Sequence, residues 1–167
     1  MTIAEFDNFK IEKKTELLRQ CCGSTVWVNK MLTVFPVEDL VDLIEDAEEK
    51  WYECTEEDWK EAFSHHPKIG DVDSIKKKFA STAEWATGEQ CGVNDAAEKT
   101  LQELADGNKA YEEKFGYIFI VSATGKSAEE ILSLLQSRLP NSPEEEIKIA
   151  MEEQGIITKI RLEKLFV

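Results

Sequence analysis

The chain has 167 residues, which is enough for one domain of ordinary size and too few for two. Its 20 Lys and Arg residues stand against 34 Asp and Glu residues, so the formal net charge is −14. Nucleic acids and anionic membranes attract net basic surfaces, and this charge therefore argues against both as partners. Apolar residues make up 42% of the chain, which is sufficient for a buried core.

The cysteines and the apolar segments indicate a reduced, cytoplasmic protein. No apolar run approaches the roughly 20 residues that span a bilayer. The N-terminal segment MTIAEFDNFK lacks the basic and apolar regions of a secretory signal. The cysteines form no C-x-x-C pair, so we expect neither a disulfide framework nor a cysteine-rich zinc site. They are Cys21, Cys22, Cys54 and Cys91.

Helix-capping residues mark the starts of most expected helices, because their side-chain oxygens accept hydrogen bonds from free backbone N–H groups. In chain order these are Ser24, Thr55 with Asp58, Ser81 with Glu84, Asn94, Ser127 with Glu130, and Ser142 ahead of Pro143. Apolar stripes at helical spacing follow them, as at Leu40, Leu43, Ile44, Ala47 and Trp51. The sequence therefore predicts an all-α, single-domain helical bundle over residues 1–167.

One segment has the composition of a strand. Residues 117–121 read YIFIV, which is rich in β-branched and aromatic residues. A lone strand has no partner for its backbone hydrogen bonds. We therefore expect extended chain or the start of a buried helix at this place.

Two side chains stand out as candidates for chemistry. His66 precedes Pro67 in a break between helices, and histidine titrates near neutral pH, so it suits acid–base catalysis. Arg161 lies four residues from both Ile157 and Leu165, so it interrupts an apolar stripe and should find an anionic or carbonyl partner. The structural alternatives are an ordinary turn histidine and an arginine in a stabilising ion pair.

A third candidate is Glu89, which shares a helical face with Trp85. A carboxylate beside an apolar ring can be desolvated and become a proton donor. In a chain with 34 acidic residues, the alternative is a solvated surface glutamate. No metal-ligand spacing and no phosphate-binding glycine loop occurs, so a cofactor-free enzyme and a helical binding module both stay open.

The order of the motifs resembles one known family. CCGSTVWVNKM, HPKIGD, EWATGEQCGV, NKAYEEKFGYIFIVSATGKS, LLQSRLPN and IITKIRLEKL follow one another as in the 2-oxo-4-hydroxy-4-carboxy-5-ureidoimidazoline (OHCU) decarboxylases. Each motif is weak alone, but the set is specific, and it extends from Phe6 to Leu165. The resemblance implies a helical homodimer without metal or organic cofactor. The implied activity forms (S)-allantoin and carbon dioxide during urate breakdown.

The resemblance also implies roles for particular residues. His66 resembles the family's catalytic histidine, and Glu89 and Gln90 resemble a pair that contacts the substrate and assists catalysis. Our hypothesis is that Glu89 assists stereospecific protonation. The substrate-binding positions that it implies are Pro67, Gln90, Val121, Ser122 and Arg161. Many family members carry S-x-x-EQ, whereas this chain has Ala86 three residues before Glu89, so we expect Trp85 to replace the serine contact.

Three other functions are compatible with the residues. The first is a helical interaction module without catalysis, which the combination of His66, Glu89, Gln90 and Arg161 argues against. The second is decarboxylation of a related ureido-heterocycle, for which Trp85 is the only indication. The third is a carboxylate-rich cation binder, which the scattered acidic residues disfavour.

Overall fold

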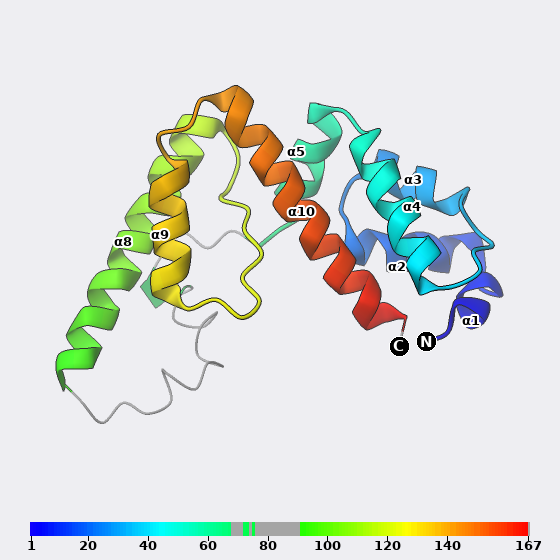
Figure 1. The fold of residues 1–167 in the computed structure, drawn as a ribbon, viewed down its shortest axis with the longest axis horizontal. Helices are drawn as coiled ribbons and strands as arrows, with labels where there is room; N and C mark the ends of the chain where they lie inside the picture. The colour runs from blue at the N-terminus through cyan, green and yellow to red at the C-terminus, as the bar shows by residue number, and fades with distance from the viewer. Residues whose placement is uncertain (68–71, 74, 76–90, 167) are drawn as a thin grey trace. The chain divides into compact units, whose positions relative to one another are not determined.

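The structure is a computed structural model that describes residues 1–67, 72, 73, 75 and 91–166, with the backbone alone at 91–96. Every regular element in this described part is a helix, which confirms the all-α prediction (Figure 1). None of these helices is both long and apolar enough to cross a membrane. The helices are α1 (Ile3–Asp7), α2 (Ile11–Cys21), α3 (Thr25–Leu32), α4 (Leu40–Tyr52), α5 (Glu56–Ser64), α8 (Cys91–Phe115), α9 (Ala128–Arg138) and α10 (Pro143–Leu165).

The chain divides into two compact units. The first unit contains Met1–His66 and Ile147–Val167, and the second contains Pro67–Glu146. The first unit therefore holds both ends of the chain, and the rings of Phe6 and Phe166 meet there with their centroids 5.2 Å apart. A single domain over residues 1–167 stays a prediction.

The predicted helix caps are confirmed wherever the structure describes them, with one exception. The Ser24 hydroxyl accepts a hydrogen bond from the backbone N–H of Trp27 at 3.2 Å. Reciprocal capping boxes open α5 and α9 at the predicted residues, and Ser142 accepts from the N–H of Glu145 ahead of α10. The pair Ser81 and Glu84 lies outside the described residues.

The exception is Asn94, which was expected to cap the long helix. Helix α8 begins at Cys91, so Asn94 lies inside it. A capping residue favours a helix start but costs only a few tenths of a kcal/mol in a helix interior, so it does not prevent extension toward the N-terminus. The predicted end is confirmed, because Gly116 takes a φ of 82° and its N–H bonds the carbonyl of Glu112 at 2.9 Å.

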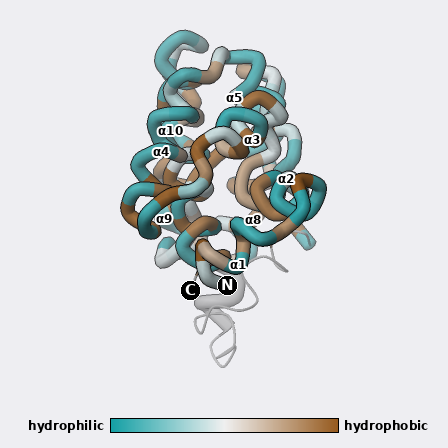
Figure 2. Tube along the Cα trace, turned by 90° about the vertical axis from the view of Figure 1, so that its right-hand side faces the viewer, coloured by the Kyte–Doolittle hydropathy of each residue, from teal (hydrophilic) through white to brown (hydrophobic). Residues whose placement is uncertain are grey.

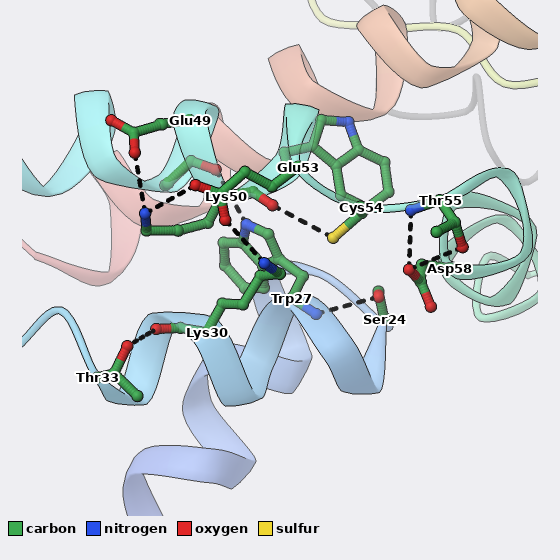
Figure 3. A network of polar contacts seen from close by, with 12 residues as sticks. Ser24, Trp27, Lys30, Thr33, Glu49, Lys50, Glu53, Cys54, Thr55 and Asp58 are labelled. Carbon is green, nitrogen blue, oxygen red and sulfur yellow. Dashed lines mark hydrogen bonds and ion pairs between the residues drawn. The ribbon is translucent and has the colours of Figure 1, made fainter.

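The core of the first unit is built around α3, which packs against α2, α4 and α5. Trp27 of α3 is fully buried, and its indole N–H donates to the carbonyl of Ala47 at 3.0 Å. On the surface, Glu53 accepts from Lys30 at 2.7 Å and from Lys50 at 3.0 Å, which links α3 to the end of α4 (Figure 3). Hydrogen bonds from these two lysines lower the pKa of Glu53 to about 2.

The second unit has a separate apolar core between α8 and α9. Residues 118–123 run beside it as extended chain, which confirms one of the two conformations expected for the YIFIV segment. Apolar and polar stretches alternate along the helices of both units in Figure 2, the pattern that directs one face of each helix inward. The buried members of this core are Ile75, Leu101, Leu104, Ala105, Tyr111, Ala128, Ile131, Leu132 and Leu135.

Candidate active site

His66 lies just beyond the end of α5. The helix ends at Ser64, and the backbone N–H of His66 still bonds the carbonyl of Phe63 at 3.2 Å. Pro67 follows and disfavours helical geometry at His66. The imidazole is half-buried, and its Nε2 lies 2.5 Å from Oε1 of Gln154. The backbone of His66 is thus held at the end of α5, and its ring contacts Gln154 of α10.

Gln154 and Thr158 form a buried polar pair one turn apart on α10. The Thr158 hydroxyl donates to the backbone carbonyl of Gln154 at 2.9 Å, and Nε2 of Gln154 donates to the Thr158 oxygen at 3.2 Å. Gln154 is fully buried and Thr158 is 5% exposed. Neither residue was predicted as part of a site. Thr158 lies three residues and Gln154 seven residues before Arg161, so helical periodicity places all three on one helix face. This spacing was the only indication in the sequence that they belong together.

Arg161 contacts the end of α2. Its Nη1 donates to the carbonyl of Cys21 at 3.1 Å and to that of Gln20 at 3.5 Å. These carbonyls belong to the last turn of α2 and have no partners within that helix. The prediction of a carbonyl or anionic partner is confirmed by these two carbonyls.

A cavity of about 530 Å³ opens between these groups within the first unit. Among its described lining residues are three cations and two histidines, and none is Asp or Glu. This composition contrasts with the net charge of −14 and favours an anionic ligand. The lining residues are Leu17, Arg19, Gln20, Cys21, Gly23, Ala62, His65, His66, Arg161, Lys164 and Leu165.

Gly23 allows His65 to pack closely against the wall of this cavity. A Cβ atom built on Gly23 would lie 2.4 Å from Cγ and 2.6 Å from Cβ of His65. Cβ does not move when the histidine side chain rotates, so rotation cannot relieve the clash. A side chain at position 23 would therefore displace the end of α5, which carries His66.

The thiols beside the cavity are held in the neutral form. Burial raises the pKa of the Cys21 thiol to about 11 and that of Cys22 to about 12, although Arg161 lowers both. A thiolate is the reactive form of cysteine, so these residues are poor nucleophiles at neutral pH. No cluster of His, Cys, Asp and Glu side chains suited to a metal ion lies among the described residues.

The other predicted site residues belong to the second unit or lie outside the described residues. Pro67, Val121 and Ser122 belong to the second unit, where Val121 and Ser122 lie on the extended segment. Ser122 is buried, and its carbonyl accepts a hydrogen bond from Nζ of Lys126 at 2.8 Å. Trp85, Glu89 and Gln90 lie outside the described residues.

A buried arginine supports the extended segment and was not predicted. Nη1 of Arg138 donates to the carbonyl of Ile120 at 2.7 Å, and its guanidinium lies 4.5 Å from the ring centroid of Phe119. Nε of Arg138 donates to the fully buried Glu146 at 2.7 Å. The Tyr111 hydroxyl donates to the same carboxylate at 2.5 Å, and burial together with this bond raises the pKa of Tyr111.

Comparisons with known proteins agree with one another. The family model for OHCU decarboxylase matches residues 7–163. The uric acid degradation bifunctional protein TTL of Arabidopsis thaliana is 39% identical over 151 residues, which are 87% of this chain and 45% of that protein. The 2-oxo-4-hydroxy-4-carboxy-5-ureidoimidazoline decarboxylase of Amia calva is 36% identical over 106 residues, or 60% of this chain and 57% of that protein. The chain thus spans about half the length of these relatives.

Two solved structures resemble the chain. A crystal structure of an OHCU decarboxylase in the presence of (S)-allantoin has a TM-score of 0.70 and 37% identity, and the match covers 89% of this chain and 95% of that chain. A crystal structure of (S)-allantoin synthase has a TM-score of 0.72 over 99% of this chain and 54% of that chain. Its 15% identity shows a shared fold alone.

Proposed function

The chain belongs to the OHCU decarboxylase family, and from this premise we propose that it decarboxylates 2-oxo-4-hydroxy-4-carboxy-5-ureidoimidazoline to (S)-allantoin in urate breakdown. The family match over residues 7–163 carries the proposal. The cavity supports it, because His66 and Arg161 line one cationic space whose volume suits a small anionic heterocycle. We expect a cytoplasmic homodimer that needs no metal or organic cofactor.

The substrate supplies its own electron sink. Its carboxylate is attached to a ring carbon that also carries a hydroxyl group and lies next to a C=N bond. When the carbon–carbon bond breaks, carbon dioxide leaves and the electron pair passes toward the C=N nitrogen, which takes up a proton. The hydroxyl group also loses its proton, so that a carbonyl forms, and a proton is added to the neighbouring planar ring carbon. The protein therefore needs to move protons and to hold the ring.

His66 and Glu89 divide the proton transfers in this proposal. His66 takes the hydroxyl proton, or hydrogen-bonds the developing oxygen, as carbon dioxide leaves. Glu89, directly or through a water molecule, helps to deliver a proton to one face of the planar carbon. Protonation from a single face yields (S)-allantoin rather than a racemate.

The remaining predicted site residues hold the substrate. Trp85 stacks on the ring, Pro67 lies beside it, and Gln90 binds the ureido or ring amides together with the backbone of Val121 and Ser122. Arg161 binds a ring or ureido oxygen. Tight binding of the carboxylate in the ground state would oppose its departure, which is why Arg161 is assigned to a different oxygen.

Circular dichroism during urate breakdown tests this function directly. Urate oxidase and hydroxyisourate hydrolase generate the unstable substrate in the cuvette, and this protein is then added. We expect a rapid rise of the (S)-allantoin signal. A signal that grows no faster than spontaneous, racemic decay would exclude the activity and leave a helical binding module or a related ureido substrate.

The two adjacent histidines provide a matched pair of variants for the site. We expect His66→Asn to slow turnover by roughly 10² to 10⁴-fold, the usual contribution of a general acid–base group. His65→Asn is the comparison and should slow turnover far less than His66→Asn, because His65 lines the same cavity but no step of the chemistry is assigned to it. Full turnover by His66→Asn would overturn its role.

A further inference from the structure

We propose that Gln154 and Thr158 set the tautomer of His66, so that Nε2 keeps its proton and Nδ1 exchanges a proton with the substrate. This inference rests on the proposed decarboxylase function and deepens it. Gln154 and Thr158 act through His66, so they are positioning residues. The geometry behind this assignment consists of three hydrogen bonds within the first unit.

The Thr158 hydroxyl determines which way the Gln154 amide faces. A hydroxyl group has one proton, and that of Thr158 is donated to the backbone carbonyl of Gln154 at 2.9 Å. Its oxygen therefore acts as an acceptor for the Gln154 side chain, which must present its NH₂ group at 3.2 Å. The carbonyl oxygen of the amide is then directed toward His66.

The amide oxygen in turn determines the protonation of His66. Oε1 of Gln154 lies 2.5 Å from Nε2 of His66, and an amide oxygen can only accept a hydrogen bond. Nε2 must therefore carry hydrogen. A neutral imidazole has only one N–H group, so its lone pair is on Nδ1. Proton uptake by the neutral ring then takes place at Nδ1.

Burial enforces this arrangement. Gln154 is fully buried and Thr158 is 5% exposed, so water cannot replace a lost partner of the amide. Reversing the amide would bring its NH₂ group toward His66 and leave the amide oxygen facing a hydroxyl whose proton is already donated elsewhere. The contact with Thr158 would then be unfavourable, and a buried group without its partner is costly.

Other titratable groups surround the histidine and also act on its charge. Arg19 and Cys21 of α2, His65 after α5, and Arg161 and Lys164 of α10 line the same cavity. Cys22 contacts Thr158 and stays a neutral thiol, because burial raises its pKa to about 12. Arg19, Arg161 and Lys164 are the cations among these groups, and the tautomer assignment applies to the neutral ring of His66.

Nitrogen-15 NMR of the imidazole rings measures the tautomer without any activity assay. The chain has only two histidines, and His65→Gln identifies the signals of His66. At a pH above the His66 titration we expect the pattern of an Nε2–H, Nδ1-lone-pair ring in the unaltered protein. The opposite tautomer, with hydrogen on Nδ1, would overturn the inference.

Variants of the pair test whether the tautomer matters for catalysis. Gln154→Leu should lower kcat about tenfold or more, while KM changes less than about threefold. The effect on kcat is expected to be only part of the whole contribution of a general acid–base group, which is roughly 10²-fold or larger. Thr158→Val should lower kcat in the same direction, and Thr158→Ser, which keeps the hydroxyl, should restore it. Unchanged kcat in both Gln154→Leu and Thr158→Val would overturn the positioning role.

Gln154→Glu provides a charge readout. A carboxylate opposite Nε2 stabilises the imidazolium, so the pKa of His66 should rise by about one unit or more, while His65 serves as the internal reference. The acid side of the pH–kcat profile should move by the same amount.

The results for the unaltered protein distinguish this inference from the proposed function. If the unaltered protein is active but carries hydrogen on Nδ1 of His66, this inference alone is overturned. If it is inactive but has the Nε2–H ring, the tautomer is confirmed and the proposed function is overturned.

Discussion

Arg138, Glu146 and Tyr111 form a buried polar cluster in the second unit. Glu146 accepts hydrogen bonds from the side chains of Arg138 and Tyr111, and Asn141 adds a third at 3.1 Å. Arg138 also holds the backbone of Ile120, next to the predicted substrate-binding positions Val121 and Ser122. Each buried charge here depends on its partners, because burial removes the solvation that would otherwise stabilise it.

Arg138→Met is therefore expected to be strongly destabilising. It leaves the carboxylate of Glu146 buried without its cation, and removal of one partner from a buried pair costs about 3–5 kcal/mol. Urea unfolding measures the loss. The double variant Arg138→Met with Glu146→Leu should recover much of it, since it removes both charges. Lys13→Met, which breaks an exposed pair with Glu16, is the control and should change little. A loss below about 1 kcal/mol in Arg138→Met would contradict the role of the pair.

At the scale of elements, short-range caps define where the helices start. The Ser127 hydroxyl accepts from the N–H of Glu130 at 3.2 Å, and the Glu130 carboxylate accepts from the N–H of Ser127 at 2.8 Å. Both bonds lie within four consecutive residues, so they form wherever the local sequence allows them. The same holds for Thr55 and Asp58 ahead of α5.

Ser127→Ala tests the contribution of such a cap. The variant removes the acceptor for the N–H of Glu130, and we expect a loss of about 1 kcal/mol in the free energy of unfolding. Ser133→Ala on the exposed face of the same helix is the matched control. It should be neutral or stabilising by a few tenths of a kcal/mol, because alanine has the higher helix propensity. Equal effects of the two variants would argue against a specific capping contribution.

At the scale of the whole molecule, buried thiols link stability to alkaline pH. Burial raises the pKa values of Cys21 and Cys54 to about 11 and that of Cys22 to about 12, from an ordinary value of 9.0. Above pH 9 the unfolded chain loses these protons and the native chain keeps them. Stability from the thiols is therefore complete below pH 9 and is lost as pH rises toward 11 to 12.

The Cys22→Ala variant isolates one of these thiols. Between pH 8 and pH 10 the unaltered protein should lose about 1 kcal/mol more stability than the variant, since one pKa unit corresponds to about 1.4 kcal/mol. Denaturant unfolding at the two pH values measures this difference. Parallel losses in both proteins would show that Cys22 ionises in the native state as readily as in the unfolded state.

The charge distribution also has meaning only at the level of the whole molecule. The composition alone, with a net charge of −14, argues against polyanionic partners. The fold nevertheless gathers Arg19, Arg161 and Lys164 around one cavity. These residues come from α2 and α10, which are far apart in the sequence, so their common location depends on the packing of the two helices.

The sequence by itself determined the all-α class, most helix ends and the family, because caps, stops and apolar stripes act over three or four residues and the family motifs are linear. It also predicted an anionic or carbonyl partner for Arg161, and the structure supplies the carbonyls of Cys21 and Gln20. Only the tertiary structure revealed that Gln154 contacts His66, which is 88 residues away in the sequence. The same is true of the hydrogen bond from Arg138 to the backbone of Ile120 in the extended segment. A glutamine on an inward helix face looks like any other polar residue until folding brings its partner within hydrogen-bonding distance. Long-range packing thus decided which buried polar groups satisfy one another, and local sequence carries no record of that pairing.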